Sequence, residues 1–507
     1  MKLQSQLPIA ILLIPFFSSW ISAMLLSFKK AVKIIYALTV VLELILISYL
    51  LSYFYHENVI LCEVGGWLYS VGISFYIGNQ AAMMLLVVVL GFAISSLGFL
   101  KTNYLPLSVM PFASLVFGGL VGLIISDDFF NCYVFMEVSS IATYILISFN
   151  KAKRTSYKVA FDYLIVGSVA GMIVLLGILT MYVATGTLSM IELQDIISNK
   201  THLLSNNSIQ LLRYSYVMIA MGFVLKAGLY PMHTWMVKTY TVSAPTISSL
   251  MSSTVTKVFV FLLYKISMIY FSSEIGIVLV KNFGNILTTV ALFGVIVMSM
   301  SNLGERNVRK EIAVSSMAQI CYFTIGIFAF NSLALTGVML QMVAHSISVS
   351  TLFLMLDSSF YDVDPHYSPR TTGDVPKYFF SRSATTKIAS GVLLLTTAGY
   401  PITIGFAGKW VFLEGVASSN GLYHFVLLLI SGAIGTVYTW RILERITFFD
   451  YVHKNHQTNT KQSNFLKIVS VISVFLVIAL GQFVLTNHFV ESGTFKNYYF
   501  NLNAINE

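Results

Sequence analysis

Charged residues are scarce in this sequence of 507 residues. Lys, Arg, Asp and Glu together make up 10% of the chain, whereas 57% of its residues are hydrophobic. Soluble domains contain about 25% charged residues. A soluble fold cannot bury so much apolar surface, so the composition excludes an ordinary soluble enzyme and indicates a protein that spans a membrane.

Cysteines and nucleotide-binding motifs are also few. The three cysteines, Cys62, Cys132 and Cys321, stand singly, which excludes an iron–sulfur or zinc site held by cysteines of this chain alone. The chain has neither a phosphate loop nor a dinucleotide fingerprint. Its basic residues are not interleaved with aromatic ones as in a nucleic-acid groove. We therefore expect no cofactor, no metal, no catalytic residue and no nucleic-acid partner. The net charge of +9 comes from basic residues in cytoplasmic loops, next to anionic lipid headgroups.

Long apolar runs predict an all-α polytopic membrane protein. A span needs about 20 apolar residues, and windows of that length predict about 14 transmembrane helices. They lie near residues 7–27, 31–54, 80–100, 106–126, 128–149, 160–184, 209–232, 246–271, 276–300, 311–330, 332–356, 385–416, 421–445 and 466–487.

The loops between these spans alternate in charge. Lys and Arg gather in residues 29–33, 151–158, 306–310 and 370–387, and again in 454–467, whereas the intervening loops are acidic or balanced. Short loops rich in Lys and Arg stay in the cytoplasm. The pattern therefore places both termini outside the cytoplasm.

Four ionisable side chains lie deep inside the apolar spans. They are Glu137, Lys226, Lys257 and Lys409. Each charge at the centre of a bilayer costs about 2.5–3.5 kcal/mol, so each needs a partner, water or a function. If Glu137 and Lys226 face each other, loss of that pairing would favour release of a proton from the lysine. The alternative is a static ion pair that fixes the register of two helices.

Polar residues in the eighth span follow a helical period. Ser249, Ser253 and Lys257 recur at every fourth position and would form a stripe on one face. Serines often join membrane helices to each other. Because a buried lysine shares this face, we favour a hydrated path over simple packing.

Two lysines accompany a proline within a span. Lys226 precedes Pro231 and Lys409 follows Pro401, and each lysine belongs to a Gly-Phe-x-x-Lys sequence. Proline interrupts a membrane helix and frees backbone groups to line a cavity. Interrupted helices in two halves of a chain are typical of a transporter core with inverted repeats. Snorkelling of the lysine to the membrane surface is the alternative, mainly for Lys409.

Several of these segments resemble one family of membrane proteins. The segments are residues 128–137, 161–168 and 185–188, Lys226 with Pro231, His233 and Trp235, then Ala244-Pro245-Thr246, Lys257, and Gly405-Phe406 with Gly408-Lys409-Trp410. They resemble the antiporter-like family, which comprises large membrane subunits of respiratory complex I and of Mrp-type cation/proton antiporters. The resemblance covers roughly residues 105–415.

The resemblance implies a fold of fourteen helices with two inverted five-helix repeats and broken seventh and twelfth helices. Applied to this chain, it implies N-terminal helices in 1–105, repeats in 106–271 and 276–445, and a cytoplasmic loop, last helix and tail in 446–507. It also implies a bacterial inner membrane, partner membrane subunits and a hydrated proton path along the membrane midplane.

The resemblance also assigns roles to residues. Glu137 modulates, Lys226 loads the proton, Lys257 connects, and Lys409 is the relay or exit lysine. His345 is a candidate central relay because imidazole titrates near neutral pH, with Gln341 one turn earlier to orient it. We expect His233, beside Pro231, to cap a broken helix. Many members have a lysine where this chain has Val349.

Four functions are compatible with these observations. The first is a proton-translocating subunit of a multi-subunit Na⁺ or K⁺/proton antiporter, which the lysine at position 409 favours. The second is a proton-pumping subunit of a redox-driven NADH-quinone oxidoreductase, without a redox centre of its own. The third is a structural subunit whose pathway has decayed at Val349. A solute transporter is the least favoured, because a chain of carboxylate and lysines offers no shaped organic site.

Overall fold

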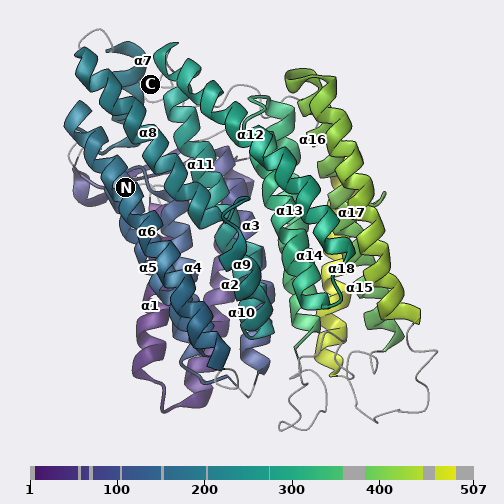
Figure 1. The fold of residues 1–507 in the computed structure, drawn as a ribbon. Coiled ribbons are helices and arrows are strands. Elements are labelled where there is room, and N and C mark those ends of the chain that lie inside the picture. Colours follow the sequence, from purple (N-terminus) through teal and green to yellow (C-terminus); the bar gives the residue numbers. More distant parts are fainter. Residues whose placement is uncertain are drawn as a thin grey trace.

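The computed structural model describes residues 6–54, 59–67, 72–102, 105–149, 154–200, 204–272, 274–357, 383–448 and 463–486. Loops 358–382 and 449–462 and the tail from residue 487, which include predicted cytoplasmic segments, lie outside the described residues. The helices run side by side along one direction, with α7 at one end of the bundle (Figure 1). The prediction of an all-α polytopic membrane protein is confirmed.

The first half of the bundle contains eleven helices and a hairpin of two antiparallel strands. The helices are α1 (Leu7–Met24), α2 (Lys29–Phe54), α3 (Asn79–Lys101), α4 (Val109–Ile125), α5 (Phe129–Ser148), α6 (Arg154–Thr185), α7 (Met190–Asn199), α8 (Asn206–Ala227), α9 (Thr234–Val242), α10 (Pro245–Leu250) and α11 (Thr256–Phe271). The strands are β1 (Ile60–Glu63) and β2 (Ser74–Ile77), with Ile60 opposite Ile77. Neither the hairpin nor the short α7 follows from the apolar windows.

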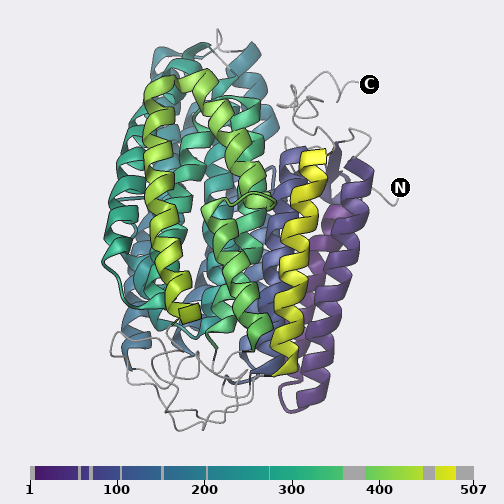
Figure 2. The ribbon, with the colours of Figure 1, turned by 90° about the vertical axis from the view of Figure 1, so that its right-hand side faces the viewer.

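The second half continues with seven helices. They are α12 (Glu274–Leu303), α13 (Val308–Ile327), α14 (Ser332–Met355), α15 (Ala384–Ala398), α16 (Ile404–Asn420), α17 (Leu422–Phe448) and α18 (Asn464–Thr486). Helices α15–α18 form one side of the molecule (Figure 2). Among the described residues, 11 helices are long and apolar enough to cross a membrane. The count of 14 spans and the inverted repeats stay predictions.

Two segments form the centre of the bundle. In α14, and in the segment Pro245–Phe271 that contains α10 and α11, 94% of the residues of the apolar window are buried, against 33% in α2 and α18. Glycines allow the close packing there, because a Cβ at Gly91 of α3 would lie 2.7 Å from the Oγ atoms of both Ser253 and Ser346. The central helices are thus enclosed by the rest of the chain.

Both predicted interruptions are present. Helix α8 ends at Ala227 and α9 begins at Thr234, while α15 ends at Ala398 and α16 begins at Ile404. Gly228 and Gly399 end α8 and α15 in the left-handed conformation, with φ of 70° and 84°, which glycine adopts without strain. A third irregularity was not predicted: residues Met251–Val255 form a π-helical turn between α10 and α11.

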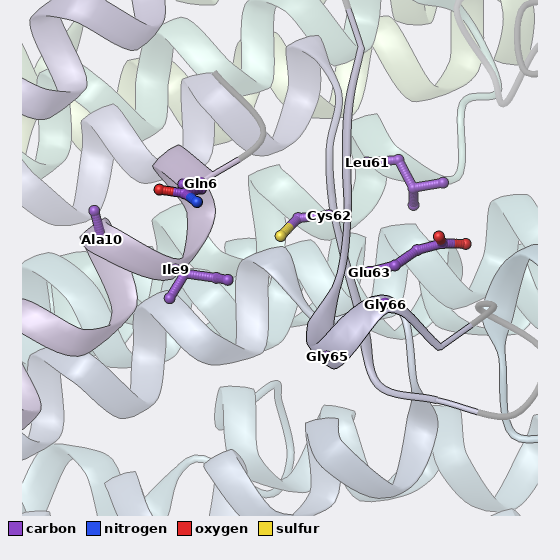
Figure 3. A pocket seen from close by; sticks show the side chains of 8 residues that line it. All are labelled: Gln6, Ile9, Ala10, Leu61, Cys62, Glu63, Gly65 and Gly66. Carbon is purple, nitrogen blue, oxygen red and sulfur yellow. The ribbon is translucent and has the colours of Figure 1, made fainter. Parts of the chain in front are cut away.

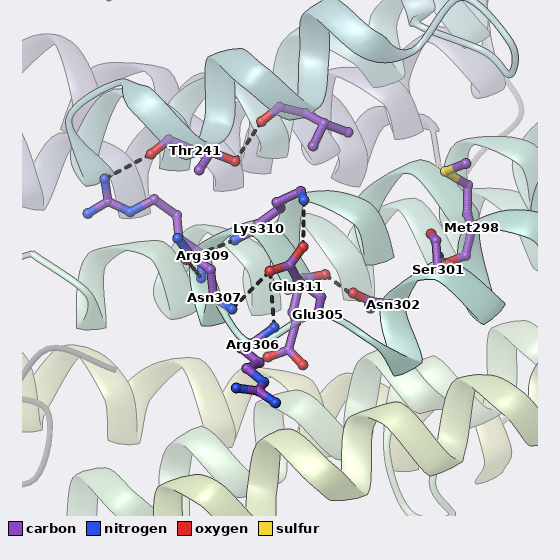
Figure 4. Close-up of polar contacts among 11 residues, drawn as sticks. Thr241, Met298, Ser301, Asn302, Glu305, Arg306, Asn307, Arg309, Lys310 and Glu311 are labelled. Carbon is purple, nitrogen blue, oxygen red and sulfur yellow. Dashed lines mark hydrogen bonds and ion pairs between the residues drawn. The ribbon is translucent and has the colours of Figure 1, made fainter. Parts of the chain in front are cut away.

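The first turn of α13 holds the end of α9 in place (Figure 4). The Arg309 guanidinium donates to the backbone carbonyls of Thr241 at 3.2 Å and Ser243 at 3.3 Å. Nearby, Lys310 pairs with Glu305 at 2.5 Å. Because carbonyls at the end of a helix lack partners within the helix, the arginine satisfies them and fixes α9 against α13.

Candidate proton relay

Lys226 and Glu137 meet in the first half of the bundle. The Lys226 Nζ lies 3.9 Å from Glu137 Oε1, donates to Ser140 Oγ at 2.6 Å, and lies 3.4 Å from the Tyr144 hydroxyl. The lysine side chain is fully buried, whereas 26% of the glutamate side chain is exposed. The two charges therefore attract each other without a direct hydrogen bond.

The helix break positions Lys226. The indole of Trp235 in α9 donates to the carbonyl of Leu225, near the end of α8, at 3.2 Å. This bond connects the two half-helices beside the lysine. His233 stands at the N-cap position of α9, but its ring contacts the Pro231 carbonyl at 3.1 Å and makes no capping bond. His233 thus occupies the cap position of α9, as expected, although its side chain makes no capping hydrogen bond.

Lys257 lies at the unpredicted π-helical turn. Its Nζ donates to the carbonyl of Ser252, within the turn, at 2.6 Å, and the lysine is 1% exposed. Ser249 donates to the Ser350 carbonyl at 2.9 Å, and Ser253 donates to the carbonyl of Ser249. The predicted polar stripe is thus buried against α14, but its hydroxyls bond mainly to backbone carbonyls.

His345 and Lys409 border the same small cavity. The cavity has a volume of about 10 Å³ and is lined by Gln319, Gln341, Ala344, His345, Thr396, Thr397, Gly405 and Lys409. That volume suits about one water molecule. Neither ring nitrogen of His345 nor the Gln341 amide nitrogen bonds to a described residue. The expectation that Gln341 orients His345 through a hydrogen bond is therefore not met, although both face this space.

Lys409 lies beside the second helix break and bonds to its backbone carbonyls. Its Nζ donates to the carbonyls of Thr397 at 3.1 Å and Ala398 at 2.6 Å, the last residues of α15. The break near Pro401 thus supplies free carbonyls, as the sequence indicated. Lys409 is partly exposed, and its ammonium is held by these two carbonyls.

The sequence interpretation overlooked Glu43 in α2 and Lys265 in α11, which are buried charged residues deep within predicted spans. They are 1% and 7% exposed. Both lie within predicted spans, so the criterion that selected Lys257 would have found them. The spans therefore contain more buried charged side chains than the four that the sequence identified.

Lys265 belongs to a cluster at the end of the bundle that carries α7. Its Nζ donates to the carbonyl of Ser126, beside the buried Asp127. Asp127 Oδ2 accepts from Ser74 of β2 at 3.0 Å and from Ser189, the N-cap of α7, at 3.2 Å. This cluster joins the hairpin, α7 and the α4–α5 junction to α11.

Asp127 makes the stability of this cluster depend on pH. Burial raises the pKa of Asp127 from 3.8 to about 7, and the Lys265 charge only partly opposes that rise. Between about pH 4 and 7 the folded state keeps a proton that the unfolded state loses, so stability falls as pH rises, by at most about 1.4 kcal/mol per pH unit. We expect Asp127→Asn to remove this component, seen as a flatter dependence of the thermal midpoint between pH 5 and 8. Equal slopes of the thermal midpoint against pH in the wild type and in Asp127→Asn would contradict this expectation.

A larger cavity lies apart from these residues. It has a volume of about 630 Å³ between the start of α1 and the hairpin, and its lining residues are Gln6, Ile9, Ala10, Leu61, Cys62, Glu63, Gly65 and Gly66 (Figure 3). None of the predicted relay residues lines it. Among the described residues, no group of three or more His, Cys, Asp or Glu could hold a metal ion.

Known proteins are similar to this chain in both sequence and fold. NADH-quinone oxidoreductase subunit N of Desulforudis audaxviator is 28% identical over 64% of this chain and 62% of its own length. A protein of Staphylococcus aureus named as an antiporter subunit, mnhD2, is 23% identical over 94% of the chain and 93% of its own length. The Mrp complex from Dietzia contains a chain with a TM-score of 0.81 at 17% identity, covering 96% of this chain and 95% of that one.

A family assignment rests on the sequence match. Residues 126–437, more than half of the chain, match the family described as NADH:quinone oxidoreductase/Mrp antiporter, TM. The matched region includes Glu137, Lys226, Lys257, His345 and Lys409. The chain is therefore a multi-pass membrane protein that belongs to the NADH:quinone oxidoreductase/Mrp antiporter family.

Proposed function

We propose that the chain is the proton-translocating membrane subunit of a multi-subunit Na⁺ or K⁺/proton antiporter. The observation that carries this proposal is the buried Lys226, held 3.9 Å from the partly exposed Glu137. An ammonium inside a membrane needs a nearby opposite charge. When Glu137 is neutralised or moves away, Lys226 loses that stabilisation and gives up its proton.

In this proposal the proton passes from Lys226 towards Lys257 and His345, and then to Lys409. The buried π-helical turn supports the middle step, because its Ser252 carbonyl already binds the Lys257 ammonium. The cavity between His345 and Lys409 supports the last step, since a single water there could join the two side chains. The repeats 106–271 and 276–445 would contain this path.

The length of the sequence alignments favours the antiporter role over a redox-driven pump. The alignment with the Staphylococcus aureus antiporter subunit covers 94% of this chain, against 64% for the subunit N relative. The higher identity to subunit N, 28% against 23%, keeps the second role as the alternative. In either role we expect partner membrane subunits, a bacterial inner membrane and termini outside the cytoplasm.

The test uses inverted vesicles from cells that express the whole gene cluster, with a fluorescent reporter of lumenal pH. We expect added Na⁺ or K⁺ to make an acidified lumen alkaline, and Lys226→Ala to abolish this response. If neither cation acts but NADH drives acidification that depends on Lys226, the redox role replaces the antiporter role.

A decayed pathway is the third possibility, and Val349 tests it. Val349 is 1% exposed in α14, four residues after His345. If water reaches this part of α14, Val349→Lys should still insert and assemble, since the ammonium would be hydrated. Immunoblots of membranes and of the purified complex would measure this. Loss of the variant from both would indicate a dry segment and favour the structural role.

A further inference from the structure

A buried carboxylate lies outside the region that carries the relay. Glu43 is in the middle of α2, is 1% exposed, and neither of its oxygens bonds to a described residue. Its neighbours on the buried face of α2 are the aliphatic Val40, Ile47 and Leu50, and Thr39, whose hydroxyl donates to the Ile35 carbonyl. Such a position is unfavourable for an ionised carboxylate.

The helices packed against α2 offer no positive charge. Helices α1 and α4 contain no titratable residue, and α3 contains only Lys101, at its end. Within α2, Lys29, Lys30 and Lys33 lie at its start, and Lys33 donates to the Leu100 carbonyl at 2.9 Å. Lys33 is about 15 Å from Glu43 along the helix axis at 1.5 Å per residue. An ionised Glu43 would therefore lack a nearby positive charge on these helices, which favours its protonated form.

Two separate hydroxyl contacts join α3 to its neighbours, one to α2 and one to the central helices. The hydroxyls of Tyr36 in α2 and Ser96 in α3 lie 2.9 Å apart, and those of Ser95 and Ser249 lie 2.8 Å apart. Adjacent serines of α3 thus face opposite neighbours, and Ser249 belongs to the polar stripe that leads to Lys257. Thr39, which is buried, lies between Tyr36 and Glu43 along the helix.

The N-terminal helices contain other polar atoms without partners. The hydroxyls of Ser18 and Ser22 in α1 and of Ser114 in α4 are buried and form no hydrogen bond with described residues. Most buried hydroxyls are satisfied by protein or water. Helices α1, α2 and α4 thus contain a buried carboxyl and three buried hydroxyls that form no hydrogen bond with described residues.

We propose that Glu43 is a second proton-binding site, which takes up and releases a proton while the central relay turns over. This inference rests on the proposed role of the chain in proton transport. The other candidate role for Glu43, a permanently protonated acid that fills the core, predicts no change in protonation and is separated from ours by the test below.

The test is Glu43→Gln in the complete complex, since glutamine keeps the shape of a neutral carboxylic acid but cannot release a proton. We expect cation-driven proton transport to fall about tenfold with a changed pH profile, because a titrating group is lost. Glu192→Gln, the same replacement in the extramembrane helix α7, serves as the matched control and should leave both unchanged. Unchanged rate and pH profile in Glu43→Gln would overturn the proposal.

Infrared difference spectra provide the second readout. Comparison of resting and cation-exposed wild-type complex should show a carboxylic-acid carbonyl band that shifts in D₂O and is absent in Glu43→Gln. A reduced rate without such a band would show a structural role and overturn the proposal. If the glutamine variant does not accumulate, Glu43→Asp should move the band, and an unmoved band would equally overturn it. Lys226→Ala measured in parallel separates the two proposals, because its full activity would refute the proposed function itself.

Discussion

Lys226→Ala is expected to reduce cation-driven proton movement by at least about 100-fold, the scale of losing a positioned proton-transfer group. The ammonium is fully buried, and its polar contacts are Glu137, Ser140 and Tyr144. Alanine removes the proton carrier but no hydrophobic span, so the protein should still insert. The initial rate of alkalinisation in inverted vesicles, normalised to the amount of assembled complex, would measure the effect.

Two further variants test whether this effect is specific to Lys226 and its partner. Lys238→Ala removes an exposed lysine of α9, close to the same helix break, and should keep the wild-type rate. Glu137→Gln retains the shape of the glutamate but not its charge, and should slow transport without disturbing assembly. A Lys226→Ala protein that transports at the wild-type rate would disprove the relay proposed here.

Gly337→Val is expected to have the second largest effect, by separating α14 from α16. A Cβ at Gly337 would collide with the backbone nitrogen of Phe412, and one at Gly408 would lie 2.9 Å from the backbone nitrogen of Gln341. Backbone cannot yield as a flexible side chain can, so the helices must part. Overpacking of this kind costs about 1–3 kcal/mol. The space between His345 and Lys409 would change with it.

The expected outcome is a lower thermal midpoint of the purified complex together with loss of most transport. Gly432→Val in α17 is the control, because the nearest atom to an added Cβ there is the Tyr322 hydroxyl at 3.9 Å. If Gly337→Val transports normally at a wild-type midpoint, close contact of α14 and α16 is not required for the relay.

Much of this architecture could be predicted from the sequence. Charges inside apolar runs identified Glu137, Lys226, Lys257 and Lys409, because a bilayer penalises them strongly. Prolines located both helix breaks, since proline cannot continue the ladder of backbone hydrogen bonds. The sequence left open whether Glu137 and Lys226 face each other. In the structure the two side chains are in contact, at 3.9 Å.

Other features left no clear signal. The strands β1 and β2 have four residues each, too few for a visible alternation of polar and apolar side chains. The π-helical turn at Met251–Val255 changes the helical phase, which an argument from fixed spacing cannot detect. The partners of Lys257 and Lys409 are backbone carbonyls, and every residue carries one. The ring of His233, the N-cap residue of α9, contacts the Pro231 carbonyl and makes no capping bond, a detail that the sequence does not indicate.

The enclosure of the two central helices has a consequence for how the chain is made. The segment Pro245–Phe271 carries Lys257 and Lys265, and it packs against α3, synthesised earlier, and against α14, synthesised later. Until α14 has been synthesised, the π-helical turn beside Lys257 lacks part of its native cover. A ribosome stalled between α11 and α14 would therefore leave a half-built protein with this polar turn uncovered, the form that membrane quality-control proteases should remove first.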